Sequence, residues 1–182
     1  MSKPRLLVHA CCAPDGLYVM DLLQGEYEAT AFFYNPNIFP AEEYGRRLQD
    51  VEKVGRLKGF PLIVEPRDHE RWLEMTRKFK DEPEMGRRCD ICYALRLNRA
   101  GRVAACRGFD MFTTVMSLSP HKNAESLNRI GRMLGGKHGV AFLEADFKKK
   151  DGFNKSVSLS RGLDLYRQDY CGCPYSRRPP RS

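Results

Sequence analysis

The strongest constraint on the fold is an alternation of short apolar runs with longer amphipathic stretches. Five runs have the length and the β-branched or aromatic content of strands: LLVHA at 6–10, EATAFFY at 28–34, PLIVE at 61–65, FDMFTTVMS at 109–117 and VAFLEAD at 140–146. In the second amphipathic stretch Tyr44, Leu48 and Val51 recur at helical spacing, and Gly59 closes it. Strands that alternate with helices favour a parallel, doubly wound α/β sheet of Rossmann-like type, here with about five strands.

The connection between the third and fourth predicted strands is longer than an ordinary crossover. It covers about residues 66–107 and contains two predicted helices, the second of which carries a CxxC pair of cysteines. We therefore expect residues 1–176 to form a single α/β domain with a helical insertion at about 66–107. Residues 177–182, RRPPRS, are expected to form a basic mobile tail.

Composition narrows the class of protein. The 182 residues include 31 Lys and Arg against 23 Asp and Glu, a formal charge of +8, and no apolar run approaches the roughly 20 residues of a membrane span. The first residues lack the apolar core of a secretory signal, so we expect a cytoplasmic protein. A chain of this length buries enough surface to fold without disulfide bonds. Its seven cysteines therefore need another explanation, which in a reducing compartment is metal or redox chemistry.

Six of the seven cysteines fall in three tight clusters, which are Cys11-Cys12, Cys89-x-x-Cys92 and Cys171-Gly-Cys173. The first cluster follows the first strand, at the edge where open α/β sheets place their ligands. Adjacent cysteines are too close for an unstrained disulfide, so metal ligation is the simpler interpretation. The second cluster puts both sulfurs on one face of a first helical turn, whose N–H groups, with Arg87 and Arg88, are expected to lower the thiol pKa. Together these two pairs offer four thiolates, as a 4Fe-4S cluster or a structural zinc requires.

The third cluster differs because Gly172 permits a sharp bend that lets the two flanking sulfurs approach each other. This suits a reversible disulfide or two ligands of a mononuclear metal. Asp15 opens the helix after the first cluster and is a candidate oxygen ligand or proton donor in the same pocket. Cys106 stands alone on a predicted helix, and we expect it to be a small buried hydrophobe outside the site.

Other polar residues near the predicted ligand edge are less specific. His9 lies inside the first strand and is either a second-sphere neighbour of a metal or a satisfied core histidine. His121 follows the fourth strand, and we expect it to contact substrate. Tyr34 and Asn35 form a turn after the second strand, also at the ligand edge, and are further candidates for substrate contact.

Five motifs together closely resemble the cobalamin-independent epoxyqueuosine reductase (QueH) family: HACCAPDG at 9–16, YNPNIFPAEEYGRR at 34–47, CDICYALRL at 89–97, TTVMSLSPHKN at 113–123 and YRQDYCGCPYS at 166–176. The resemblance spans nearly the whole chain. It implies reduction of the epoxide of epoxyqueuosine, at the tRNA wobble position, to queuosine. It also implies a 4Fe-4S cluster and an α/β fold similar to nucleotide-binding HUP domains. Carried onto this sequence, the resemblance assigns the cluster to Cys11, Cys12, Cys89 and Cys92, and a redox role to Cys171 and Cys173.

A competing assignment that the family also suggests adds a mononuclear iron beside the cluster. Asp15 and some of the cysteines, Cys171 and Cys173 among them, would be its ligands, and the sequence leaves this partition open. Our mechanistic hypothesis is that a Lewis-acidic metal or a protonated Asp15 assists C–O cleavage. The cluster and the Cys171/Cys173 pair would deliver two electrons from an electron donor that the sequence does not identify.

The basic charge is expected to hold the tRNA anticodon stem-loop, whose wobble base must be unpaired to reach a buried site. The residues that we expect to form this surface are Arg46, Arg47, Arg87, Arg88 and the tail residues Arg177 and Arg178. Arg47 is also a candidate for direct contact with the substrate.

Two other functions remain compatible with the sequence. The same four thiolates could form a closed zinc site in an RNA-binding module without catalysis. An ATP-dependent tRNA thiolation enzyme is less favoured, because the first strand-to-helix turn lacks the Gly- or Ser-rich phosphate cradle that this chemistry needs.

Overall fold

The computed structural model of the chain describes residues 2–176, and its centre is a five-stranded parallel sheet. The strand order is β3-β2-β1-β4-β5. The strands are β1 (Arg5–His9), β2 (Glu28–Phe33), β3 (Leu62–Val64), β4 (Met111–Thr114) and β5 (Ala141–Phe142). The helices are α1 (Ala13–Leu23), α2 (Ala41–Lys58), α3 (His69–Thr76), α4 (Arg87–Cys106), α5 (Ala124–His138) and α6 (Gly152–Gly162), with short 3-10 helices η1 (Arg77–Phe79), η2 (Val115–Leu118) and η3 (Pro174–Ser176). The predicted parallel α/β architecture is confirmed.

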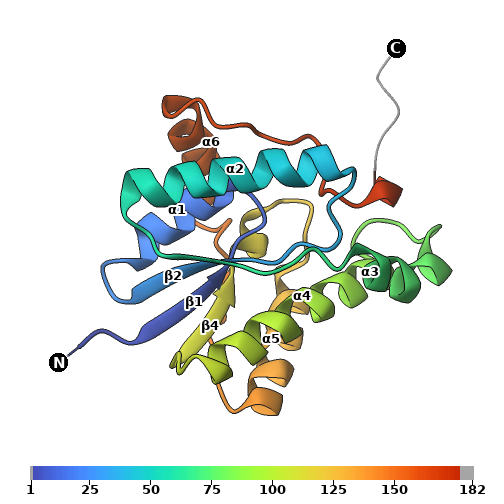
Figure 1. Cartoon of the computed structure of the whole chain (residues 1–182), viewed down its shortest axis with the longest axis horizontal. Coiled ribbons are helices and arrows are strands. Elements are labelled where there is room, and N and C mark those ends of the chain that lie inside the picture. Colours follow the sequence, from blue (N-terminus) through green and yellow to red (C-terminus); the bar gives the residue numbers. More distant parts are fainter. Residues whose placement is uncertain (1, 177–182) are drawn as a thin grey trace.

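Helices cover both faces of the sheet (Figure 1). The helices α1, α2 and α6 lie on one face, and α4 and α5 lie on the other. The central strand β1 is therefore buried on both sides, and Leu6, Leu7 and Val8 have no exposed surface. A strand that is buried on both faces has a continuous apolar sequence, so the apolar run LLVHA predicts this strand.

The sheet has its topological switch point at β1. This strand pairs with β2 on one side and with β4 on the other. The chain leaves β1 toward one face of the sheet and leaves β4 toward the other, so the two connections diverge at the carboxyl edge. Open α/β sheets bind their ligands in the crevice that such a divergence creates.

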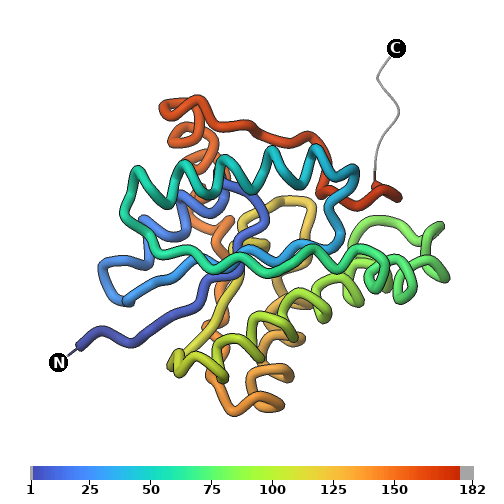
Figure 2. The backbone as a smooth tube through the Cα atoms, viewed as in Figure 1, coloured from blue at the N-terminus to red at the C-terminus, as the bar shows by residue number. Residues whose placement is uncertain are grey.

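The predicted helical insertion lies between β3 and β4, and its two helices have different roles. The longer helix α4 packs on β1 and β4 and against α5, so it is the crossover that covers the sheet. The shorter helix α3 and the residues up to 86 extend beyond the sheet edge (Figure 2). The CxxC pair lies at the start of α4, where these two parts meet.

The structure corrects three details of the sequence analysis. Only Met111–Thr114 of the predicted fourth strand is extended, and η2 follows directly. Only Ala141–Phe142 of the predicted fifth strand pairs, because this edge strand has one neighbour. The helix α6 was not predicted because its sequence, GFNKSVSLSRG, has little apolar periodicity. It is held on α1 partly by a hydrogen bond from the Ser156 hydroxyl to the Pro14 carbonyl (3.1 Å).

The segment after α6 returns along α2 toward the site (Figure 2). Lys53 donates a hydrogen bond to the Leu163 carbonyl, and Asp50 accepts one from the Tyr166 N–H. This path brings the CGC segment back to the carboxyl edge of the sheet. None of the described helices has the length and hydropathy that a membrane span requires.

Candidate metal and redox site

The first cysteine pair lies in the turn between β1 and α1. Cys12 is the N-cap residue of α1 in an extended conformation, and Pro14 in the first turn helps to start the helix. This start places Asp15 directly beside the pair. The ligand atoms of Cys11, Cys12 and Asp15 all lie within 4.8 Å of one another, and all three residues are buried. Two thiols and a carboxylate therefore form one group that could hold a metal ion.

The turn is fixed from outside by Asn35 and Arg96. The side-chain amide of Asn35 donates a hydrogen bond to the Ala10 carbonyl (2.9 Å), just before the cysteine pair. The Asn35 carbonyl oxygen accepts a hydrogen bond from the Arg96 guanidinium on α4 (2.6 Å). All three residues are buried. Asn35 thus ties the first cysteine turn to the helix that carries the second pair.

The second pair, Cys89 and Cys92, occupies the first turns of α4. The backbone N–H of Met85 donates a hydrogen bond to the Cys89 sulfur (3.3 Å). Burial raises the pKa of Cys89 to about 11 and also raises the pKa of Cys92. The expectation that the helix start and its arginines would lower these values is wrong, because burial outweighs them. Arg88 is itself buried, and its guanidinium donates to the carbonyls of Phe79, Lys80 and Glu82.

The third pair forms the predicted tight turn. Gly172 has a φ of +99°, a conformation that L side chains rarely adopt, and its carbonyl accepts a hydrogen bond from the Phe39 N–H (2.9 Å). The Cys173 N–H donates to the Cys171 sulfur (3.4 Å), and the Ser176 hydroxyl lies 3.0 Å from the same sulfur. The hydrogen bond from the Cys173 thiol lowers the pKa of Cys171 to about 5 and raises that of Cys173. Neither cysteine forms a disulfide, and the lowered pKa of Cys171 favours its thiolate form.

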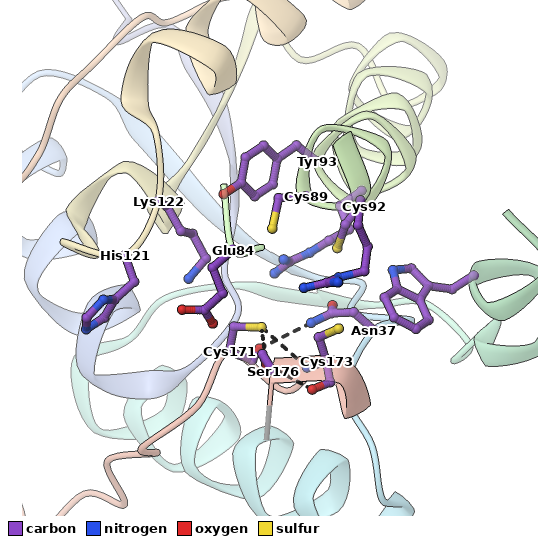
Figure 3. Close-up of a pocket in the computed structure, with 13 residues that line it drawn as sticks. Asn37, Glu84, Cys89, Cys92, Tyr93, His121, Lys122, Cys171, Cys173 and Ser176 are labelled. Carbon is purple, nitrogen blue, oxygen red and sulfur yellow. Dashed lines mark hydrogen bonds between the residues drawn. The ribbon is translucent and has the colours of Figure 1, made fainter. Parts of the chain in front are cut away.

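Four cysteines from two distant segments share one cavity, which we call the thiol cavity (Figure 3). Cys89 and Cys92 face it from α4, and Cys171 and Cys173 face it from the C-terminal turn. A larger adjoining cavity, the polar cavity, includes Asp15 in its lining. The two cavities share Glu84, His121, Lys122, Cys171 and Ser176 in their linings. The second and third cysteine clusters therefore share the thiol cavity, and Asp15, which groups with Cys11 and Cys12, lines the polar cavity beside it.

Asp15 has an unusual electrostatic environment. Burial and, after it, the negative charge of Cys11 raise its pKa to about 6. The guanidinium of Arg167 lies 3.7 Å from the carboxylate, and the Ser156 hydroxyl lies 3.5 Å from it. A carboxyl group with this pKa holds or releases a proton close to neutral pH, as a general acid requires.

Of the four residues predicted to contact substrate, His121 lines both cavities. The other three are buried and line neither cavity, so substrate contact by them stays a prediction. Tyr34 stacks on Phe32, with 6.4 Å between ring centroids, and Asn35 makes the link described above. Arg47 is 1% exposed, so its expected place on a basic surface is wrong. Its guanidinium pairs with Glu43 and donates to the carbonyls of Tyr170 and Cys171.

Further expectations have mixed outcomes. Cys106 is exposed rather than buried, since the last turn of α4 carries it past the packed face, but it does lie outside the site. His9 is a core histidine with its ring nitrogens 3.0 Å from the Thr114 hydroxyl and 3.1 Å from the Tyr34 carbonyl. Arg88 is buried, as noted above, so it is not part of a basic surface, whereas Arg46 and Arg87 are exposed. The tail arginines 177 and 178 lie outside the described residues.

Sequence reasoning missed several residues that complete the site. Trp72 has no exposed surface and lines the thiol cavity from α3, although its aromatic stripe reads only as core. Arg96 and Lys122 also line the thiol cavity. Gln168 lines the polar cavity, and its amide hydrogen-bonds to Cys12. The sequence did contain a signal for Arg96. It follows Cys92 by four residues on the predicted helix, so the two side chains share one helix face.

The donor atoms around the thiol cavity suit a sulfur-rich anionic group. Among the described residues, the indole N–H of Trp72 and the Nε–H of Arg96 are buried without a hydrogen bond of ordinary geometry. Both stabilise negative charge on the Cys92 sulfur. Thiolate ligands with N–H donors directed at sulfur are the environment of iron–sulfur clusters and of thiolate-bound zinc.

Sequence comparison identifies relatives over almost the whole chain. The family described as "Epoxyqueuosine reductase QueH" matches residues 6–179. The protein named epoxyqueuosine reductase QueH from Streptococcus pyogenes serotype M1 is 34% identical over 182 residues, covering 97% of this chain and 71% of its own. The protein of that name from Thermotoga maritima is 36% identical over 176 residues, covering 94% of this chain and 89% of its own.

Comparison of folds finds more distant structures. The U34-tRNA thiolase NcsA from Methanococcus maripaludis, solved with its [4Fe-4S] cluster, superposes with a TM-score of 0.60 at 15% identity. The match covers 98% of this chain and 63% of the thiolase, so the chain spans less than two thirds of that protein. A predicted subunit of tRNA methyltransferase from Methanocaldococcus jannaschii has a TM-score of 0.57 at 12% identity, over 84% of this chain and 76% of its own. At these identities the likeness establishes the fold alone.

Proposed function

Since the chain belongs to the epoxyqueuosine reductase QueH family, we propose that it reduces the epoxide of epoxyqueuosine at the tRNA wobble position to queuosine. The observation that carries this proposal is a cavity lined by two cysteine pairs, beside a second cavity lined by Asp15, whose carboxylate groups with the third pair. Removal of an epoxide oxygen to leave an alkene consumes two electrons and two protons and releases water. The site therefore needs an electron-transfer centre and a proton donor beside it.

We assign the electron-transfer centre to the thiolates. Cys11, Cys12, Cys89 and Cys92 would hold a 4Fe-4S cluster, and such a cluster supplies electrons one at a time. Cys171 and Cys173 would form a redox-active dithiol that can pair with it. The low pKa of Cys171 supports this role, because the thiolate is the reactive form of a cysteine.

The group formed by Cys11, Cys12 and Asp15 supports the alternative partition, in which a mononuclear iron sits beside the cluster. A mixed set of two thiolates and a carboxylate suits a mononuclear iron better than it suits a 4Fe-4S cluster, whose usual ligands are thiolates. Cys171 and Cys173 are further candidates as ligands of such an iron. The ratio of iron to sulfide in the purified protein distinguishes the two assignments. A single 4Fe-4S cluster gives equal amounts, whereas an added mononuclear iron gives an excess of iron over sulfide.

Asp15 is the proposed proton donor. Its carboxyl lines the polar cavity and has a pKa of about 6, so about a tenth of it is protonated at pH 7, far more than of an ordinary aspartate. Arg167 and Ser156 hold the carboxyl group in place. His121, which lines both cavities, is the proposed contact to the substrate. Lys122 lies at the same boundary and can stabilise negative charge on the departing oxygen.

The polar cavity is the proposed position of the modified base. It is larger than the thiol cavity and shares the Cys171 sulfur with it. The base would have to be unpaired, so we propose that the anticodon stem-loop of tRNA is the part bound. The +8 formal charge and exposed arginines such as Arg46 and Arg87 support phosphate contacts around the entrance. We expect the protein to act in the cytoplasm, where tRNA is modified.

One observation bears on the thiolation alternative. The fold is shared with the thiolase NcsA, but the first strand-to-helix turn contains two buried cysteines and Asp15. This turn is where a nucleotide phosphate would have to bind at the helix N-terminus. A carboxylate at that position would repel the phosphate, so an ATP-using reaction is disfavoured.

The test is a turnover assay with the protein purified without oxygen. Iron and sulfide are quantified, and tRNA that contains epoxyqueuosine is incubated with the protein and a low-potential reductant. Nucleosides are then separated by liquid chromatography and identified by mass. We expect iron with sulfide and formation of queuosine; a colourless zinc protein without turnover would support the RNA-binding alternative.

Cysteine variants locate the chemistry. Cys171→Ser and Cys173→Ser are expected to abolish turnover while the protein keeps its brown colour. Cys106→Ser is the matched control, because this cysteine is exposed and outside both cavities. Full activity in both active-site variants would exclude the proposed dithiol role.

A further inference from the structure

Arg96 is an internal cation that forms no ion pair with a carboxylate of residues 2–176. Its side chain is 2% exposed. Arg47, which is equally buried, pairs with Glu43. The hydrogen bond that Arg96 donates to Asn35 fixes its position but supplies no negative charge. Burying a charge without compensation costs several kcal/mol, so Arg96 must be neutralised by some other group.

Cysteine sulfurs are the negative groups that act on Arg96, although the carboxylate of Glu84 also lines the thiol cavity. Arg96 lines the thiol cavity together with Cys92, which precedes it by one turn of α4, and with Cys171. Its Nε–H is buried and makes no ordinary hydrogen bond within the described chain. Despite burial, which lowers it, the pKa of Arg96 is raised by the charges of Cys92, Cys11 and Cys171. Sulfurs from two cysteine clusters share the thiol cavity with Arg96, and the charge of the third cluster, at Cys11, also acts on it.

A second cation, Lys122, faces the same sulfurs from the loop before α5. It lines both cavities and is partly exposed, and Asp15 is among the charges that act on it. Water and this carboxylate can therefore balance Lys122 in part. Arg96 is almost fully buried, and the negative charges that act on its pKa are those of the cysteine sulfurs, so the sulfur centre is its main source of negative charge.

We propose that Arg96 is the charge partner of the cysteine-bound centre, held toward the sulfurs by Asn35. This inference rests on the proposed function for the identity of the centre. A 4Fe-4S cluster with four thiolates carries a net charge of 2− when oxidised and 3− after it takes up one electron. A fixed neighbouring cation stabilises the second state more than the first, so Arg96 raises the reduction potential of the centre. Arg96 is a positioning residue, since it acts on the centre and not on the substrate.

The test compares three variants of the full chain with the parent, all purified without oxygen. Arg96→Gln removes the charge and keeps an amide that can bond to Asn35, whereas Arg96→Lys keeps the charge. Arg99→Gln is the matched control, because Arg99 lies on the same helix and pairs with Glu65. The midpoint potential of each protein is measured by titration with dithionite and EPR, and iron and sulfide are counted per chain.

We expect the midpoint potential to shift to more negative values in Arg96→Gln and to stay near the parent value in Arg96→Lys and Arg99→Gln. An unchanged potential in Arg96→Gln would overturn the proposal, as would equal shifts in both Arg96 variants. If Arg96→Gln assembles no centre, retention of iron by Arg96→Lys supports the charge pairing, and loss from both overturns it. A parent protein without iron and sulfide would refute the proposed function instead. If that protein contains zinc, loss of zinc from Arg96→Gln with retention by Arg96→Lys would support the charge pairing, and equal retention by both variants would overturn it.

Discussion

Gly172→Ala tests whether the shape of the CGC turn positions the proposed redox pair. The φ of +99° at this residue disfavours any L side chain, at a cost of about 1–2 kcal/mol. A methyl group there would also lie 2.8 Å from the Cγ1 atom of Ile38 and 3.2 Å from its Cα. Overpacking of this kind costs about 1–3 kcal/mol. The substitution therefore introduces about 2–5 kcal/mol of strain.

Four hydrogen bonds oppose detachment of the turn. Arg47 donates to the carbonyls of Tyr170 (3.1 Å) and Cys171 (3.2 Å), Asn37 donates to the Cys171 carbonyl (3.2 Å), and the Phe39 N–H donates to the Gly172 carbonyl (2.9 Å). At about 0.5–1.5 kcal/mol for a neutral bond and 1.5–3 for a charged one, these bonds contribute about 4–9 kcal/mol. The strain is about half of this sum, so we expect the turn to shift while the segment stays attached.

Two measurements test whether the CGC turn shifts in the Gly172→Ala variant. Thermal denaturation of the variant should show a Tm lower by at least about 5 °C, since each kcal/mol changes Tm by about 2–4 °C in a chain of this size. The Cys171–Cys173 disulfide formed at equilibrium with glutathione, quantified by peptide mass spectrometry, should also decrease, because the sulfurs move apart.

The matched control is Gly45→Ala, in α2, where an added methyl group meets no atom within 4 Å. It should be neutral or stabilise the protein by about 0.5–1 kcal/mol, because alanine favours a helix over glycine. A Gly172→Ala variant with the parent Tm and an unchanged disulfide fraction would refute the strain argument.

Three further predictions follow from the same structure. Arg47→Met should reduce the free energy of unfolding by at least about 3 kcal/mol, because it leaves Glu43 without its buried cation and removes the hydrogen bonds to the Tyr170 and Cys171 carbonyls, and a loss below about 1 kcal/mol in urea denaturation would contradict this. In metal-free protein carrying Cys106→Ser, the rate at which iodoacetamide alkylates Cys171 should change by only about a tenth between pH 6 and 8, because a thiol with a pKa of about 5 is already a thiolate at pH 6. An ordinary thiol would react roughly 80-fold faster at pH 8 than at pH 6, and such an increase would exclude the low pKa. Arg46→Gln should weaken tRNA binding and reduce the slope of log affinity against log salt by about 1, and an unchanged slope would remove Arg46 from the interface.

Much of the architecture follows from local sequence. The apolar run at residues 6–10 is long enough and uniform enough to define the central strand, and α2 ends at the predicted Gly59, which adopts a left-handed φ of 71°. The sequence alone also identifies the three cysteine clusters, because two cysteines that are close in the chain stay close in any fold. The position of the first cluster at the carboxyl edge followed from the strand-to-helix alternation.

Other features depend on residues that are far apart in the sequence. The pattern of α6 shows little apolar periodicity because the helix is held on α1 partly through Ser156, and no local signal marks such a contact. Asn35 and Arg47 lie in motifs that look like surface loops, yet both are buried by the segments they hold. A polar side chain can be buried when distant groups satisfy its hydrogen bonds, and the sequence does not indicate which groups those are.

The sequence by itself determined a parallel α/β fold, the elements that carry each cysteine pair, and the family. These depend on periodicity and on spacing within a few residues. Only the tertiary structure decided which cysteines share a cavity, and that Arg96 lines this cavity without an ion pair among the described residues. Those relations join segments that are far apart in the chain, from Cys89 to Cys173. Their energies come from burial and charge in a shared volume, which exists only once the chain has folded.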